Sequence, residues 1–176
     1  ITPGNFTFRS REFEQMETQF YIKPEDKEGE KWFEYWKQNR MDFYLSLGVS
    51  KERLRFKDHD PDKRAHYARA ATDIEYEYPW GFDEVMGIHH RGDWDLRRHG
   101  EYSGQDMKFR DPETGEQYLP FDIETSTGVD RTILVLLTDA YSEENGKVKL
   151  KLDPRLAPFK VAVFPLLGNK PELIKL

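Results

Sequence analysis

The stretch FRSREFEQMETQF, residues 8–20, determines how the rest of the chain is organised. Side chains on a strand alternate between two faces, so one face of this stretch carries Arg11, Phe13, Gln15, Glu17 and Gln19. A core-facing strand does not tolerate unpaired charges, and a solvent-facing strand has no need of the aromatic ring. Ordered polar groups on a rigid strand suit a small polar ligand, which makes this face a candidate binding site. An edge strand with a solvated polar face explains the stretch equally well.

The composition indicates one well-cored domain without a membrane span. Of the 176 residues, 37% are hydrophobic and 14% aromatic, so we expect a core rich in Phe, Tyr and Trp. Charged residues make up 34%, and no apolar run approaches the ~20 residues of a spanning helix. The absence of cysteine excludes disulfides and thiolate metal sites, and it fits a reducing compartment, so we expect a cytoplasmic protein. The net charge of −6 argues against a broad phosphate-binding surface and still permits a local basic patch.

Both ends of the sequence read as parts of elements that need partners. The first five residues, ITPGN, indicate a turn that enters a strand. Residues 159–167, FKVAVFPLL, are typical of a strand buried in a parallel sheet, and residues 170–174 read as a helix start with proline in its first turn. One β-α unit cannot bury both its faces, so we expect the sequence to be part of a longer protein.

The patterns between the two ends predict three helical stretches and several strands. Aromatic residues at three- and four-residue spacing predict a helix over residues 24–47, ended by Gly48. A polar helical turn over residues 91–100 is expected to end at Gly100, and an apolar helix over residues 128–141 is expected to lie buried against the sheet. Strands are expected at residues 72–78 (half-buried), 84–88 (with a bulge or close approach at Gly87), 106–109 and 117–124 (a hairpin), and 147–152.

This order of elements predicts the α+β class, an antiparallel β-sheet flanked by helices packed on one side. Three polar clusters come from separate strands: the face of residues 11–17, the pair Asp83 and Glu84, and the stretch ETSTGVDR, residues 124–131. Arg131, one turn into an apolar helix, is either paired with Asp130 or another acid, or is a fixed cation for a phosphate.

The sequence lacks the motifs of several other kinds of active site. The chain has neither a Walker loop nor a dinucleotide fingerprint, and no G-x-S-x-G elbow that would indicate a covalent nucleophile. The five histidines lack the spacing of a metal site; they are His59, His66, His89, His90 and His99. The adjacent pair, His89 and His90, would point to opposite faces of a strand.

The segments FRSREFEQME, GFDEVMGIHHRGDWDL and ETSTGVDR, the last followed by an apolar helix, resemble class II glycyl-tRNA synthetases in this order and spacing. The segment HYARAATDIEYEYPWG is similar to the part of that family between the first two, so the resemblance covers nearly the whole chain. It implies a class II synthetase-like catalytic core over residues 1–152, incomplete at its N-terminus. Residues 153–176 would then be a linker and the first β-α unit of an α/β anticodon-binding domain.

The resemblance also implies a function: glycine–tRNA ligase, which activates glycine with ATP and Mg²⁺ and transfers it to tRNA(Gly), as a cytoplasmic homodimer. Arg11 and Arg131 would be the catalytic residues, both acting on the ATP phosphates, with Glu84 reaching them through magnesium. The implied ATP-binding residues are Phe8, Arg9, Ser10, Arg11, Glu12, Phe13, Glu84, Val85, Gly128, Val129, Asp130 and Arg131. The implied glycine-binding residues are Phe13, Glu14, Gln15, Met16, Glu17, Glu124, Thr125, Ser126, Thr127 and Gly128.

The sequence departs from the family's pattern at two positions. Gly4 stands where the family usually has an arginine that contacts the tRNA acceptor end, and Thr125 replaces a usual proline. The family's first motif and the first strand of its second motif are not in this sequence, so we do not expect the 176 residues alone to form a competent enzyme.

Two other functions fit the residues. One is a catalytically inactive synthetase-like accessory or nucleic-acid-binding protein, although Arg131, Phe13 and Glu84, which such proteins normally lose in part, are all present. The other is a metabolic enzyme that makes aminoacyl adenylates for another acceptor, which anticodon binding by a further region would distinguish.

Overall fold

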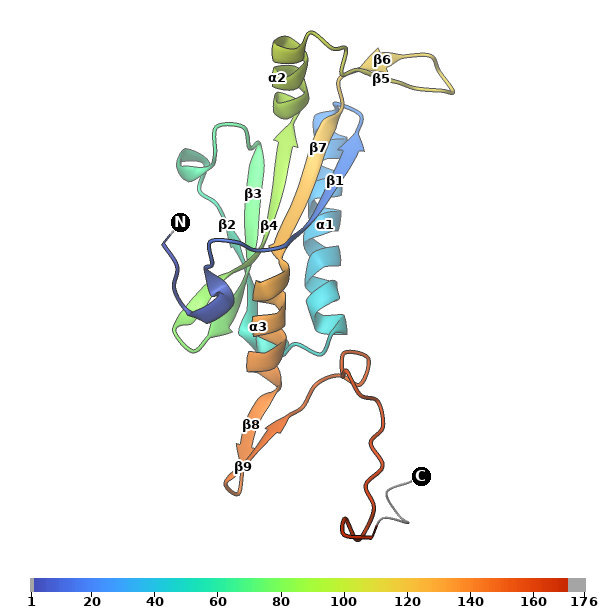
Figure 1. Ribbon diagram of the computed structural model, residues 1–176. Coiled ribbons are helices and arrows are strands. Elements are labelled where there is room, and N and C mark those ends of the chain that lie inside the picture. The colour runs from blue at the N-terminus through green and yellow to red at the C-terminus, as the bar shows by residue number, and fades with distance from the viewer. Residues whose placement is uncertain (1, 171–176) are drawn as a thin grey trace.

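A five-stranded antiparallel sheet forms the centre of the computed structural model, which describes residues 2–170 (Figure 1). This confirms the predicted sheet and its class. Neighbouring strands run in the order β1 (Gln15–Ile22), β7 (Phe121–Gly128), β4 (Gly81–Gly92), β3 (Ala70–Tyr78) and β2 (Leu54–Asp58).

Two helices cover one face of this sheet. They are α1 (Asp26–Ser46), which packs on β3, β4 and β7, and α3 (Val129–Ala140), which continues directly from β7. A third helix, α2 (Trp94–Ser103), follows β4 at one end of the sheet (Figure 1). The remaining elements are the 3₁₀ turns η1 (Phe6–Phe8), η2 (Lys51–Arg53) and η3 (Pro61–Lys63) and the hairpins β5 (Phe109–Arg110) with β6 (Gln117–Tyr118) and β8 (Tyr141–Glu144) with β9 (Lys147–Leu150).

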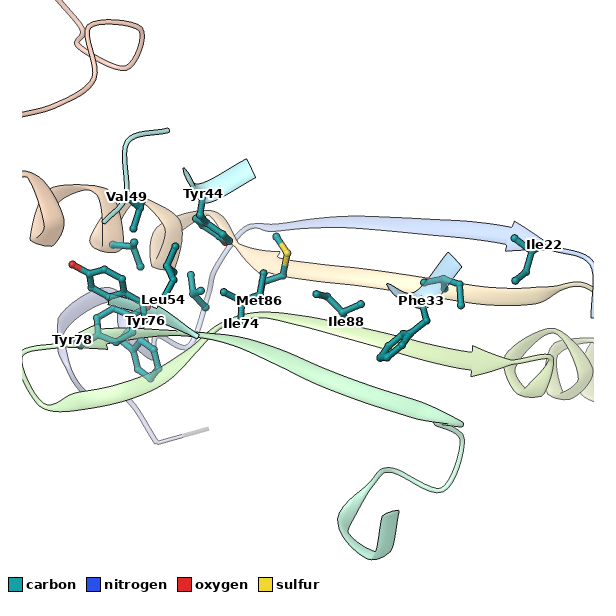
Figure 2. Close-up of a cluster of buried hydrophobic side chains, with 14 of the residues drawn as sticks. Ile22, Phe33, Tyr44, Val49, Leu54, Ile74, Tyr76, Tyr78, Met86 and Ile88 are labelled. Atoms are coloured by element: carbon teal, nitrogen blue, oxygen red, sulfur yellow. The ribbon is translucent and has the colours of Figure 1, made fainter. Parts of the chain in front are cut away.

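The hydrophobic core lies between the sheet and these two helices. Figure 2 shows its side chains in a row along the sheet, from Tyr78 at one end to Ile22 at the other. The hydroxyl of Tyr44, on α1, is within 3.1 Å of Thr127 Oγ1 on β7 and 3.5 Å of Thr132 Oγ1 on α3. These buried hydroxyl contacts join the two helices to the sheet.

The other face of the sheet is polar, and we call it the polar face. Because side chains alternate along each strand, the aligned registers bring every second residue to this face. Its members include Gln15, Glu17, Gln19, Tyr21, Arg55, Lys57, Asp73, Glu75, Glu84, Gly87, His89, Arg91, Asp122, Glu124 and Ser126.

Two β-bulges in β4 adjust what this strand presents. The register skips Val85 opposite β3, so Glu84 and Gly87 both face the polar side although they are three residues apart. It also skips Arg91 opposite β7. Bulges re-aim side chains and occur near active sites. A bulge or a close approach was expected at Gly87. The bulge lies at Val85 instead, and Gly87 has a close neighbour, since a Cβ there would lie 2.8 Å from His89 Cε1.

The prediction of one strand from residue 8 to residue 20 was wrong for its first half, because β1 begins only at Gln15. The chain before it forms a small loop in which Gly4 and Arg9 exchange two backbone hydrogen bonds of 3.1 Å. Asn5 and Phe6 turn the loop with φ of 53° and 56°. The hydroxyl of Ser10 then donates to the Glu12 carbonyl, which holds the following residues out of a ladder.

Three other element predictions need correction. The strand over residues 72–78 is not half-buried, since Arg55, Lys57 and His59 cover its acids Asp73 and Glu75. Helix α2 runs through Gly100 and ends at a later glycine, Gly104, which takes φ 70°. Helix α3 is only partly buried, and two of its apolar side chains are exposed, namely Ile133 (49%) and Leu137 (41%).

Two end signals are confirmed. Helix α1 stops with Gly48 just after its C-cap, at φ 88°, and the turn of residues 111–115 connects β5 and β6 as a hairpin. The strand bounds predicted for this hairpin, 106–109 and 117–124, were wrong, because β5 begins only at Phe109, β6 ends at Tyr118, and residues 121–124 belong to β7 of the main sheet. None of the helices within residues 2–170 is long and apolar enough to cross a membrane.

The strand expected at residues 159–167 is not formed. Its side chains are exposed, up to 94% for Leu166, and no other segment of the described chain pairs with it. An apolar strand is stable only with paired edges and covered faces. The helix expected after residue 170 lies outside the described residues, and the division of the chain after residue 152 stays a prediction.

Candidate active site

A pocket of about 410 Å³ opens where the loop of residues 4–9 meets the ends of β7 and β4. It joins residues from the three polar clusters that the sequence singled out. Its lining residues are Thr2, Thr7, Phe8, Arg9, Ser10, Phe13, Gln15, Glu84, Ser126, Thr127, Gly128, Asp130 and Arg131.

Arg131 is held in this pocket by three groups. Its Nε donates to the Phe8 carbonyl and its Nη1 to the Glu84 carbonyl, each at 3.1 Å. Nη1 also lies 3.3 Å from the Glu84 carboxylate, so the acid partner is Glu84 and not Asp130. Nη2 has no protein partner among the described residues, which leaves donors for an anion.

An aromatic stack supports the guanidinium from below. Arg131 lies 4.3 Å from the ring centre of Phe8, which contacts Tyr78 and Trp80 edge-on at 5.1 and 5.4 Å. Tyr78 and Trp80 stack on each other at 4.7 Å. Phe8, which is 3% exposed, therefore acts through packing and its carbonyl, and its ring is not open to a nucleotide.

Another part of the pocket lining comes from Gln15, the first residue of β1, and from Phe13 just before that strand. Phe13 lines the pocket and is 48% exposed, so its ring is available for stacking. Gln15 Nε2 donates to Ser126 Oγ at 3.1 Å, and the Val129 N–H at the start of α3 donates to the Glu14 carbonyl at 2.9 Å. These bonds connect β1 to the end of β7 and to α3.

A second, smaller pocket of about 110 Å³ lies further along the polar face, next to α2. Its lining residues are Gln19, Tyr21, Arg91, Gly92, Asp95, Leu96, His99, Asp122 and Glu124. From Gly128 to Asp122 the polar row of β7 runs six residues, or roughly 20 Å, from the larger pocket to the smaller one.

Arg91 organises the small pocket. It donates to both carboxylate oxygens of Asp95, at 2.6 and 2.9 Å, and to Glu124 at 3.1 Å, while its guanidinium lies 4.2 Å from the ring centre of Tyr67. The hydrogen bond to Asp95 raises the pKa of Arg91, so this cation is permanent. Burial raises the pKa of Glu124, and the charge of Arg91 opposes that shift.

A chain of hydrogen bonds runs along β1 beside this pocket. The Tyr21 hydroxyl donates to Gln19 Oε1 at 2.7 Å, and Gln19 Nε2 donates to Glu17 Oε1 at 2.9 Å. These bonds orient Glu17 on the same face of the sheet as Glu124. Glu17 pairs with Ser126, which is two residues after Glu124 on β7.

Several predicted site residues do not present their side chains to either pocket. Thr125 accepts from Arg40 Nε at 3.0 Å on the helix face. Thr127 borders the larger pocket, but its hydroxyl points away from it and donates to the buried Val85 carbonyl at 2.5 Å. Met16 lies on that face too. The pocket linings also leave out the predicted residues Arg11, Glu12, Glu14, Glu17, Val85 and Val129.

Sequence reasoning missed Arg91, Asp95 and Asp122. Arg91 and Asp95 lie within a stretch that carried the family resemblance, and Asp122 is two residues before Glu124 on the same strand face. That spacing of two residues from Glu124 is the signal by which Asp122 could have been found from the sequence.

The histidines do not form a metal centre. His89 lies on the polar face and His90 on the helix face, as predicted, and His59 Nε2 contacts Asp73 Oδ2 at 2.7 Å. Burial lowers the pKa of His90 to about 4, and its Nδ1 accepts from the Gly92 N–H. Within the described residues, no group of three or more His, Asp or Glu side chains is placed to hold a metal ion.

Comparison with known proteins identifies relatives of this arrangement. The chain is 54% identical to the glycine–tRNA ligase of Caldanaerobacter subterraneus subsp. tengcongensis over 171 residues, which are 94% of this chain and 36% of that protein. It is 50% identical to the glycine–tRNA ligase of Borreliella burgdorferi over 184 aligned residues, covering 100% of this chain and 41% of the relative. No protein-family model matches.

Among solved structures, a seryl-tRNA synthetase from Pyrococcus horikoshii, complexed with ATP, has the same fold. It superposes with a TM-score of 0.67 over 85% of this chain and 32% of that one, at 22% identity. The chain is thus a homologue of glycine–tRNA ligases, matching a segment of somewhat over a third of their length, and its antiparallel sheet is that of a class II aminoacyl-tRNA synthetase.

Proposed function

We propose that the protein carrying this chain is a glycine–tRNA ligase, which joins glycine to AMP and then transfers it to tRNA(Gly). The observation that carries the proposal is the fixed cation Arg131 in one pocket, together with a small acidic pocket bordered by the same polar strand face of β7. The names of the relatives support this choice of amino acid.

ATP suits the larger pocket. The free Nη2 of Arg131 can donate to a phosphate, and Phe13 offers a ring for adenine. The solved structure of the related fold, described as complexed with ATP, supports this use of the fold. Of the twelve implied ATP residues, the pocket includes Phe8, Arg9, Ser10, Phe13, Glu84, Gly128, Asp130 and Arg131. A role for Arg11 at the phosphates stays a prediction.

Glycine suits the small pocket. The pocket has a volume of about 110 Å³ against about 410 Å³ for the larger one, which favours the smaller of the two substrates. Glu124 lines this pocket and Glu17 lies on the same strand face, so both can supply negative charge for an ammonium group. We expect the small volume to disfavour amino acids with larger side chains.

In the first step a carboxylate oxygen of glycine attacks the α-phosphorus of ATP. The bond from that phosphorus to the β-phosphate oxygen breaks, and pyrophosphate leaves. In the second step a ribose hydroxyl at the tRNA end attacks the carbonyl carbon, its proton passes to solvent, the bond from that carbon to the phosphate oxygen breaks, and AMP leaves. The chain's contribution is to align the reactants along β7 and to offset charge on the leaving phosphates with Arg131.

Magnesium fits this site in one respect. Glu84 places a carboxylate, 47% exposed, at the larger pocket, and Mg²⁺ prefers one or two carboxylates together with phosphate oxygens and waters. A bound ion would neutralise phosphate charge. Glu84 would hold it.

The proposal extends to the assembly: a cytoplasmic homodimer that binds tRNA(Gly) through a region following residue 152. Light scattering after size exclusion tests the dimer in the full-length protein.

ATP–pyrophosphate exchange with glycine, alanine and serine tests the reaction. We expect exchange with glycine only, in the full-length protein. No exchange with any of the three, together with retained tRNA binding, would replace the proposal by an inactive nucleic-acid-binding protein.

A further inference from the structure

Asp122 is the least satisfied charged group of the small pocket. It lies in register between Tyr21 of β1 and Gly92 of β4, and it is 5% exposed. Its Oδ1 is buried and has no hydrogen-bond partner among the described residues, although the side chain lines the pocket. A buried carboxylate without a partner is costly, so it must either take a proton or receive a cation.

The groups that face Asp122 do not supply that cation. Glu17 and Tyr21 face it from β1, Glu124 from β7, Arg91 from β4, and Asp95 and His99 from α2. The single guanidinium, Arg91, already bonds to Asp95 and Glu124. The pocket therefore contains more carboxylates than Arg91 can neutralise.

We propose that Asp122 is a further ammonium-binding residue of this pocket, which holds a proton when the pocket is free and releases it to solvent when a primary ammonium enters between Asp122 and Glu124. The proposal deepens the function given above and rests on it for the identity of the natural ligand. The pocket of about 110 Å³ is lined by both carboxylates, so a small amine inside it lies within reach of both.

The electrostatics agree with this exchange. Burial raises the pKa of Asp122 to about 7, Glu124, Asp95 and Glu17 act in the same direction, and Arg91 opposes them. An ammonium group in the pocket favours the charged carboxylate and moves that pKa down.

A direct test follows the carboxyl carbon of Asp122 by ¹³C NMR in the full-length protein, with Asp122→Asn to assign the signal. Methylammonium is the probe, since it carries the ammonium and nothing else of an amino acid. We expect a midpoint near neutrality in the free protein and a fall of about one pH unit or more with methylammonium. A midpoint in the ordinary aspartate range, or one that methylammonium does not move, would overturn the proposal.

A second test measures the KM for glycine in pyrophosphate exchange against pH. Because glycine binding releases the proton of Asp122, the wild-type KM for glycine should rise as the pH falls below neutrality, by up to about tenfold per pH unit. Asp122→Asn should match the wild type at low pH, bind glycine more weakly at high pH, and show no such slope. Asp62→Asn, at an exposed position of η3, should keep the wild-type profile.

A wild-type slope that persists in Asp122→Asn would contradict the role of Asp122. If the wild type shows no exchange with glycine at any pH, the proposed function fails. The methylammonium titration still decides the role of Asp122 in that case.

Discussion

Arg131 illustrates how one residue is prepared for an anion before any ligand binds. Two carbonyl oxygens and the Phe8 ring fix its guanidinium, and the Glu84 carboxylate occupies one side of it. Backbone carbonyls orient the group without cancelling its charge. Only Glu84 competes with a phosphate, and its exposed side chain can move away.

The first prediction concerns Arg131→Ala in the full-length protein. Loss of this cation should lower pyrophosphate exchange about 100-fold or more, because charge stabilisation by one such donor contributes about 3–4 kcal/mol. Far-UV circular dichroism should stay unchanged. Arg98→Ala, an exposed position on α2 that lines neither pocket, is the control. Exchange within about threefold of the wild type would remove Arg131 from the reaction.

The second prediction concerns the stability of Asp122→Asn. The folded pKa of Asp122, about 7, lies above the ordinary value of 3.8, so the folded state binds the extra proton and loses stability as the pH rises between these values. The asparagine variant avoids that loss. We expect it to equal the wild type near pH 4 and to exceed its free energy of unfolding near pH 8, by roughly 4 kcal/mol at most. Urea unfolding at both values measures this, and an equal difference at both would contradict it.

At the scale of elements, β7 serves two purposes through its alternation. Its helix-facing row, with Ile123 and Thr127, packs and bonds to α1, while its polar row borders both pockets. Stability and ligand binding are therefore separable between neighbouring residues of one strand.

The third prediction compares Thr127→Val with Ser126→Ala. Removing the Thr127 hydroxyl leaves the buried Val85 carbonyl without that donor and should cost about 1–3 kcal/mol of stability, with little effect on the KM for glycine. Ser126→Ala should leave stability within about 0.5 kcal/mol and raise the KM for glycine or ATP. Thermal unfolding and exchange kinetics on both variants test this. A KM change in Thr127→Val together with a stability loss in Ser126→Ala would contradict the division of β7 into a packing row and a binding row.

The fourth prediction concerns the contact of α1 with β4. A Cβ added at Gly29 would lie 2.3 Å from His90 Nε2, and His90 is buried. Gly29→Ala should therefore destabilise the protein by about 1–3 kcal/mol. Gly4→Ala is the control, since a Cβ there meets nothing within 4 Å. Equal unfolding midpoints for both variants would show that α1 can move away from His90 without losing stability.

At the scale of the whole molecule, the architecture was predictable where local patterns agree with the final environment. Thr72, Ile74, Tyr76 and Tyr78 alternate as a strand does, and Gly48 ends α1 because its φ of 88° is open to glycine. The antiparallel sheet with helices on one side follows from such elements.

The burial and contacts of a side chain could not be predicted where they depend on residues far away in the sequence. Arg11 leaves the strand face because a loop closed by Gly4 and Arg9 precedes it. Asp73 and Glu75 are buried only because β2 lies beside them. Asp122 acquires its environment from β1, β4 and α2 together, and no local window contains these elements. Candidate residues could be named from the sequence, but not which of them face the same cavity.

The fifth prediction concerns residues 159–167. Their exposed apolar side chains, with Val163 at 89% and Leu166 at 94%, should make the 176-residue chain self-associate. Replacing both residues with lysine should shift the apparent mass in light scattering towards the monomer across a concentration series. An unchanged mass would place the contact elsewhere.

The alternation of β7 also limits how this region can change over generations. An insertion or deletion of one residue within Phe121–Gly128 would send the carboxylates into the core and the threonines into the pockets. The β5–β6 hairpin, only two residues per strand, carries no such constraint. Descendants of this gene are therefore expected to vary in length at the hairpin and to accept only substitutions in β7.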